Sequence, residues 1–166
     1  MMRNTIFILF AIVALSSCSE GVSKTYTIEN IELIAEGPLF DGPNTMQATH
    51  VIDLNQLEAG LAAENIEAVK LTKATVSNTE GDSFNNIRNF VLQLTSADAK
   101  MEKAGVLNPI PKDTPTVELT PAAEAELTDN FKQKELILVL DADLEGDREE
   151  SLAFKGTFEF EITYKK

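Results

Sequence analysis

Histidine and cysteine are the side chains most often used for catalysis and metal binding, and the chain of 166 residues has one of each, His50 and Cys18. A histidine can act as a general base or bind a metal ion. His50, however, alternates along the chain with Ala48 and Ile52, which is typical of a strand with one buried face. We therefore expect His50 to line the interior of the fold or its margin. With one histidine, a transition-metal site would depend on carboxylates alone, and we predict no catalytic or cofactor-binding residue.

Enzyme motifs are absent from the sequence. There is no Gly-x-Ser-x-Gly nucleophile elbow, no glycine-rich phosphate loop and no dinucleotide-binding fingerprint. Two carboxylates can hydrolyse a glycosidic bond. However, the chain has 27 acidic residues, so close pairs of carboxylates are expected by chance. It has no tryptophan and two tyrosines, which counts against a flat aromatic platform for sugars.

An acidic segment, residues 141–150, carries the one pattern that suggests a metal ion. Oxygen ligands at alternate positions followed by a glycine are typical of the start of an EF-hand calcium loop. The pattern then fails, because the twelfth position is Leu152 instead of a bidentate glutamate. The candidate calcium ligands are Asp141, Asp143, Glu145 and Asp147. We favour the alternative that the segment is a solvated hairpin tip whose charges discourage strand aggregation.

The first 18 residues have the pattern of a targeting signal. Arg3 is followed by an unbroken apolar run of ten residues, Ile6 to Leu15, which is too short to span a hydrocarbon core of about 30 Å. The run ends in Leu15-Ser16-Ser17-Cys18, which resembles the lipobox of bacterial lipoproteins. The resemblance implies cleavage before Cys18 and attachment of a diacylglycerol and an acyl chain, such as palmitate, to Cys18. An ordinary secretory signal is the alternative.

Such cleavage would remove 17 residues and leave 149, which suits one domain. Loss of Arg3 would change the formal net charge from −13 to −14. An acidic surface of this kind repels nucleic acid and lacks a polybasic face for anionic lipid, so we expect the acyl chains to provide the membrane contact. The expected organisation is a signal peptide over residues 1–17, a lipidated tether over 18–25 and one domain over 26–166.

The residue after Cys18 gives the expected location. In enterobacterial lipoproteins an aspartate there marks retention at the inner membrane. Ser19 stands at this position, so the resemblance implies the outer membrane. An acidic cluster next to the cysteine is similar to a surface-export signal of the Bacteroidota, and Glu20 alone matches it poorly. Both a periplasmic and a surface-facing domain therefore stay open.

Strands dominate the rest of the chain. In residues 152–164 the apolar side chains are almost all even-numbered and the polar ones odd-numbered, which predicts a half-buried antiparallel strand. Gly156 interrupts the apolar face and indicates a close approach or a twist. Residues 136–144 form the expected hairpin partner of this strand. In residues 26–35 the apolar parity slips by one, which predicts a β-bulge near Glu29 and Asn30.

Two short helices are expected between strands. Asp53 and Gln56 match a capping box at the start of residues 53–63. Thr120 and Pro121 match an N-cap and first helical position ahead of Phe131. Prolines in residues 97–115 predict that any strand there lies at a sheet edge.

These patterns predict a mainly β fold, an antiparallel two-sheet sandwich of about six to eight strands with one or two short helices. The layout is similar to small β-sandwich lipoproteins of the Bacteroidota that have no assigned activity. We expect a non-catalytic binding or structural lipoprotein of the cell envelope, with an envelope or extracellular protein as partner and no nucleic acid. The alternatives are a carboxylate-based hydrolase of envelope or extracellular material and an anchored subunit of an envelope complex.

Overall fold

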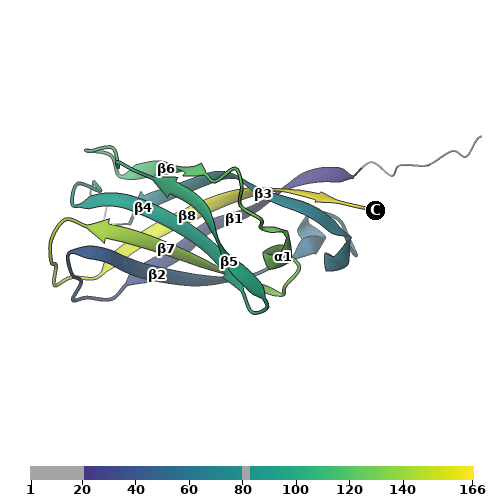
Figure 1. The fold of residues 1–166 in the computed structure, drawn as a ribbon, viewed down its shortest axis with the longest axis horizontal. Coiled ribbons are helices and arrows are strands. Elements are labelled where there is room, and N and C mark those ends of the chain that lie inside the picture. Colours follow the sequence, from purple (N-terminus) through teal and green to yellow (C-terminus); the bar gives the residue numbers. More distant parts are fainter. Residues whose placement is uncertain (1–20, 80–82) are drawn as a thin grey trace, which may run out of the picture.

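The computed structural model describes residues 21–79 and 83–166, and its fold is mainly β (Figure 1). The strands are β1 (Val22–Ala35), β2 (Gly42–Val51), β3 (Ile66–Asn78), β4 (Ile87–Ser96), β5 (Ala99–Leu107), β6 (Thr116–Pro121), β7 (Glu135–Leu144) and β8 (Leu152–Tyr164). The helical pieces are the 3-10 turns η1 (Leu54–Gln56) and η2 (Ala63–Asn65) and the α-helix α1 (Thr128–Phe131). No helix in the described ranges is long and apolar enough to cross a membrane.

The eight strands form one antiparallel sheet in the order β1-β8-β3-β6-β5-β4-β7-β2. The sheet curls until its two end strands, β1 and β2, approach each other, so it is a nearly closed barrel. The predicted two-sheet sandwich is therefore wrong. A short ladder, Gly105 with Pro121 and Val106 with Thr120, joins the two halves through β5 and β6. The sequence pattern could not reveal this, because strands of a barrel and of a sandwich both bury alternate residues.

The predicted hairpin between the last two strands is also wrong. β7 pairs with β2 and β4, whereas β8 pairs with β1 and β3. The acidic segment therefore crosses from one half of the barrel to the other instead of forming a hairpin tip. A short connection between two strands made the hairpin the simplest expectation. The hydrogen bonds of a ladder, however, come from backbone groups that every non-proline residue carries, so the sequence of a strand does not show which strand it pairs with.

The predicted side-chain parity of β8 is confirmed. Phe158 and Phe160 are fully buried in the barrel, whereas Glu161, the residue after Phe160 in the same strand, is exposed. Gly156 marks a close approach, because a Cβ atom there would lie 2.5 Å from the ring of Phe158. The buried even-numbered residues of β8 are Leu152, Phe154, Phe158, Phe160, Ile162 and Tyr164.

The predicted bulge in β1 is confirmed as well. The register against β8 shifts between Ile28 and Ile31, and Asn30 has a φ of 52°. The bulge lets Ile28 and Leu33 both face the barrel interior although their numbers differ in parity. β1 begins at Val22, so residues 22–25, which we expected in the tether, belong to the first strand.

The helical predictions hold only in part. Asp53 caps η1 by accepting a hydrogen bond from the Asn55 N–H at 3.1 Å, but the turn ends after three residues and Gly60 adopts a φ of 78°. Thr120 and Pro121 lie in β6, and the second helix is confined to α1.

The prediction of an edge strand in residues 97–115 is wrong. The strand β5 lies inside the sheet between β4 and β6, because it ends before the prolines that we expected to restrict it to an edge.

Candidate functional site

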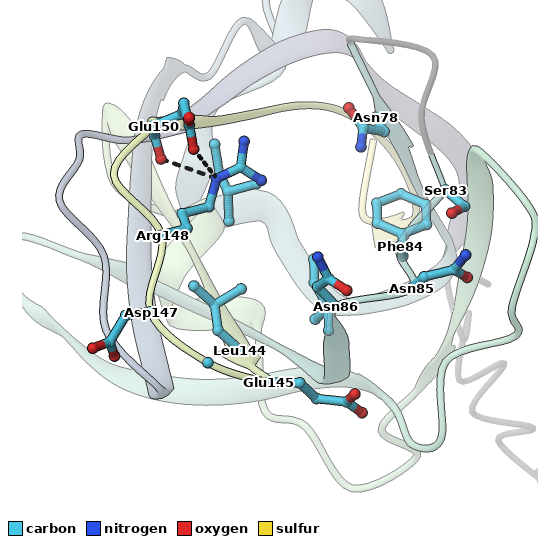
Figure 2. A pocket seen from close by; sticks show the side chains of 13 residues that line it. Asn78, Ser83, Phe84, Asn85, Asn86, Leu144, Glu145, Asp147, Arg148 and Glu150 are labelled. Carbon is cyan, nitrogen blue, oxygen red and sulfur yellow. Dashed lines mark hydrogen bonds and ion pairs between the residues drawn. The ribbon is translucent and has the colours of Figure 1, made fainter.

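A pocket of about 550 Å³ opens at one end of the barrel (Figure 2). It is formed where the end of β3, the loop before β4 and the connection from β7 to β8 meet. Ala35, at the far end of β1 from Val22, pairs with the pocket residue Leu152. The pocket therefore lies at the end of the barrel opposite to the start of β1. Its described lining comprises Asn78, Ser83, Phe84, Asn85, Asn86, Ile87, Leu144, Glu145, Gly146, Asp147, Arg148, Glu150 and Leu152.

Buried apolar side chains form the base of the pocket. Phe84 is 1% exposed, and its ring centroid lies 5.4 Å from that of Phe90 and 5.5 Å from that of Phe154. Leu144 and Leu152 complete this base from the ends of β7 and β8. The three aromatic rings fill this end of the barrel, so the pocket has a rigid apolar floor.

A charged pair lies on one wall. The Arg148 Nε donates a hydrogen bond to the Glu150 carbonyl oxygen at 3.0 Å and lies 4.0 Å from a Glu150 carboxylate oxygen. Two backbone hydrogen bonds, at 2.8 and 2.9 Å, fix Arg148 to Leu39. Figure 2 shows the Arg148 side chain beside Glu150 at one side of the cavity. The backbone contacts with Leu39 therefore help to hold Arg148 on this wall.

Amide side chains form much of the remaining wall. Asn78 and Asn86 point toward the cavity in Figure 2. The Asn86 carbonyl accepts a hydrogen bond from the Glu145 N–H at 2.8 Å, which ties the loop before β4 to the end of β7. The Asn85 side chain instead bonds to Asp113, at 3.0 and 3.1 Å, and braces the loop from outside. The pocket wall thus carries amide side chains above an apolar floor.

The four calcium candidates do not converge. Asp141 accepts hydrogen bonds from Thr45 Oγ1 at 2.6 Å and from Gln93 Nε2 at 2.7 Å. Asp143 accepts from Arg88 at 2.8 Å and from Asn89 at 2.9 Å. Both carboxylates therefore bond to neighbouring strands on the outer face of the sheet.

The other two candidates, Glu145 and Asp147, follow the end of β7. Glu145 lies 3.8 Å from Lys112, and Asp147 accepts the Asp41 N–H at 2.9 Å. In Figure 2 both side chains point away from the cavity. Across the described ranges, no group of three or more histidine, cysteine, aspartate or glutamate side chains is arranged to hold a metal ion.

Arg88 connects three elements next to the pocket. Its guanidinium lies 2.6 Å from Asp41 in the loop before β2 and 2.8 Å from Asp143 in β7. The hydrogen bond from Arg88 lowers the pKa of Asp41, with further help from the Gly146 N–H. Asp143, a candidate calcium ligand, thus has a structural role as the counter-ion of Arg88.

His50 lies at the seam, which we define as the line where β1 and β2 approach each other. Its Nε2 is 2.8 Å from the hydroxyl of Tyr26 in β1. Partial burial lowers the pKa of His50, which favours the neutral imidazole. The expected position at the margin of the interior is confirmed, and it is remote from the pocket because Tyr26 pairs with Phe160 in the other half of β8.

A second group of charges lies at the end of the barrel where β1 begins. The Glu58 carboxylate accepts hydrogen bonds from Lys24 at 3.1 Å and from the Tyr164 hydroxyl at 3.2 Å, and it pairs with Lys166 at 3.3 Å. Lys24, followed by Lys166 and Tyr164, lowers the pKa of Glu58. These contacts fasten the loop after η1 to the first and last strands.

Comparisons with known proteins give no family for the chain. No protein-family model matches it, and no curated protein matches it. Cys18, the predicted lipidation site, lies outside the described residues. Reasoning from the sequence missed Asn78, Asn86 and the pocket role of Arg148, because polar residues from a strand end and two separate connections share no spacing that would indicate a common site.

Proposed function

We propose that this protein is a lipid-anchored binding protein of the bacterial cell envelope, held at the outer membrane through Cys18 and without catalytic activity. The observation that carries the binding role is the pocket of about 550 Å³, which is within the usual range for small-molecule sites. Its lining is mainly polar and charged above an apolar floor, and polar groups in such sites fix the orientation of a ligand.

The proposed anchor and the pocket lie at opposite ends of the barrel. β1 has 14 residues, and a strand rises about 3.3 Å per residue, so the pocket lies roughly 45 Å from Val22. An anchor at Cys18 would place the membrane four residues before Val22. The pocket would then face away from the bilayer, toward the aqueous compartment.

The outward direction of Glu145 and Asp147 supports a binding role over a carboxylate-based hydrolase, which needs two carboxylates facing the substrate. Among the residues that the structure describes, the large exposed apolar side chains are Ile34, Phe40, Val51 and Met101, and they come from separate elements. We therefore prefer a ligand-binding protein to an obligate subunit of an envelope complex.

Two experiments test the proposal. An alkyne fatty acid supplied to cells should label the protein, and Cys18→Ala should abolish the label; equal labelling of both would overturn the lipid anchor. For binding, methyl-labelled lipoprotein in detergent micelles should be screened against a library of small polar and apolar molecules. Hits should shift the Leu144 and Leu152 methyl resonances, and a library without any such hit would overturn the binding role.

A further inference from the structure

We infer, on the basis of the proposed lipid anchor, that the end of the barrel where β1 begins binds the phosphodiester group of a phospholipid in the surrounding bilayer. The site is a second pocket, of about 210 Å³, which we call the proximal pocket. The inference uses five residues of its lining, Glu58, Leu61, Tyr164, Lys165 and Lys166.

The proximal pocket lies next to the point where the anchored chain would leave the membrane. Tyr164, at the end of β8, pairs with Val22 at the start of β1, and Figure 1 shows these two strand ends side by side. Val22 is four residues after Cys18, and an extended chain spans at most about 3.6 Å per residue, so Val22 would lie within roughly 14 Å of the acylated cysteine. Headgroups beside the anchor would therefore reach the pocket.

The charges at this pocket leave one ammonium group for an anion. One oxygen of the Glu58 carboxylate accepts hydrogen bonds from Lys24 at 3.1 Å and from the Tyr164 hydroxyl at 3.2 Å, and the other lies 3.3 Å from Lys166. Lys24 also donates to the Leu57 carbonyl oxygen, which directs its charge to the loop that carries Glu58. With Glu58 balanced by Lys24, the positive charge of Lys166 is not balanced within this group.

The lysines that line the pocket are more exposed than the carboxylates they pair with. The Lys166 side chain is 61% exposed and that of Glu58 35%. Lys165 is 55% exposed, and its partner Glu67, whose carboxylate lies 2.5 Å away, is 35% exposed. An ammonium group has three donors, so each lysine can bond to a phosphate oxygen and to its carboxylate at the same time.

A lipid is a better source of the phosphate group than the solution. The chain has a net charge of −13, which repels free anions over a long range. The anchor, in contrast, would keep lipid phosphates beside the pocket at a high effective concentration. Leu61, which is half-buried on the same lining, can pack against the glycerol carbons next to the phosphate. Such a contact, added to the acyl chains, would fix the tilt of the barrel on the membrane.

NMR of the intact, methyl-labelled lipoprotein in micelles of an uncharged maltoside detergent tests the inference. Phosphatidylcholine added to the micelles should shift the Leu61 methyl resonances in a saturable way. Diacylglycerol with the same acyl chains, which lacks the phosphate, should leave them unchanged. Glycerophosphocholine, the same headgroup free in water, should bind at least about tenfold more weakly, because nothing concentrates it beside the pocket.

Variants assign the phosphate contact to the two lysines. Lys165→Gln and Lys166→Gln should each weaken the response to phosphatidylcholine at least about threefold, because each removes a charge-assisted hydrogen bond. Lys73→Gln is the matched control, because Lys73 forms a similarly exposed ion pair with Glu159, at 3.9 Å, on the wall of the barrel and outside the pocket. Its response should equal that of the wild type.

Three results would overturn the inference: an equal response to diacylglycerol, equal affinity for glycerophosphocholine, or equal responses of the wild type and all three variants. Labelling of Cys18 separates this contact from the anchor. A fatty-acid-labelled protein whose Leu61 resonances do not respond to phosphatidylcholine would overturn the contact and leave the anchor standing. A protein without the label would overturn the anchor and the contact that rests on it.

Discussion

The Tyr26 hydroxyl lies 2.8 Å from His50 Nε2 and connects β1 to β2, the two strands that end the sheet. The Asp53 N–H donates to the same hydroxyl oxygen at 3.2 Å, so the hydroxyl also binds the segment that follows β2. The Tyr26 ring also packs edge-on against Phe131, with centroids 5.9 Å apart, and is itself buried. The single histidine therefore helps to close the seam.

We predict that stability falls as the pH decreases from 7.5 to 5.5. Burial lowers the pKa of His50 below its ordinary value of 6.5, so the unfolded chain binds the proton more strongly than the folded one. The contribution of His50 is complete above pH 6.5 and is lost as the pH falls through the lower folded value. Urea midpoints measured across this range should decrease.

His50→Gln is the control for this pH effect. No other side chain of the sequence has an ordinary pKa between 5.5 and 7.5, so the midpoint of the variant should be nearly constant across the range. A wild-type midpoint that rises on acidification, or a variant with the same pH dependence as the wild type, would contradict the prediction.

Truncation of the β8 core should be costly. Phe158→Ala and Phe160→Ala should each lower the free energy of unfolding by about 3–5 kcal/mol, because both rings are fully buried. Glu161→Ala, on the outer face of the same strand, should change it by less than about 0.5 kcal/mol. Urea denaturation measures both effects. A larger loss for the glutamate than for the phenylalanines would show that the strand faces are reversed.

Gly156→Ala should destabilise the barrel by about 1–3 kcal/mol through overpacking. The added methyl group would lie 2.5 Å from two atoms of the Phe158 ring, which is fully buried and cannot easily move. Gly105→Ala is a matched control in another strand, because its nearest neighbour would lie at 3.4 Å. Thermal denaturation should rank Gly156→Ala well below Gly105→Ala, and the reverse order would contradict the close approach at Gly156.

Calcium at millimolar concentration should leave the melting temperature unchanged. Asp141 and Asp143 already bond to side chains of neighbouring strands, and Glu145 and Asp147 point elsewhere. Differential scanning fluorimetry with and without calcium measures the effect. A rise of several degrees, lost in the double variant Asp141→Asn with Asp143→Asn, would instead establish a calcium site.

Alternation of side chains was enough to predict most strands and their buried faces. The pattern in β8 predicted which side chains enter the core, and the slip in β1 predicted its bulge, because burial depends on local parity. Such a pattern does not show which strands pair with each other. Nothing in residues 136–144 indicates that β7 pairs with β2 and β4 instead of β8, since backbone hydrogen bonds are the same for any of them.

The pocket could not be predicted from the sequence for the same reason. Asn78, Asn86 and Arg148 lie around one pocket only because the register of the strands brings the end of β3 and two connections to one end of the barrel. The acidic segment, residues 141–150, was singled out in the sequence for its alternating carboxylates. Its carboxylates suggested calcium, whereas the structure places Arg148 and Glu150 of the same segment on the wall of a pocket.

The place of β8 between β1 and β3 has a consequence for how the protein is made. Both partners precede it by at least 76 residues, the separation of the registered pair Asn78–Phe154, so half of the barrel cannot assemble until the last strand has been synthesised. Pairings of such long sequence separation form slowly. A chain exported with its N-terminus first would therefore stay unfolded while it is threaded across the membrane and would fold only after its C-terminus is released.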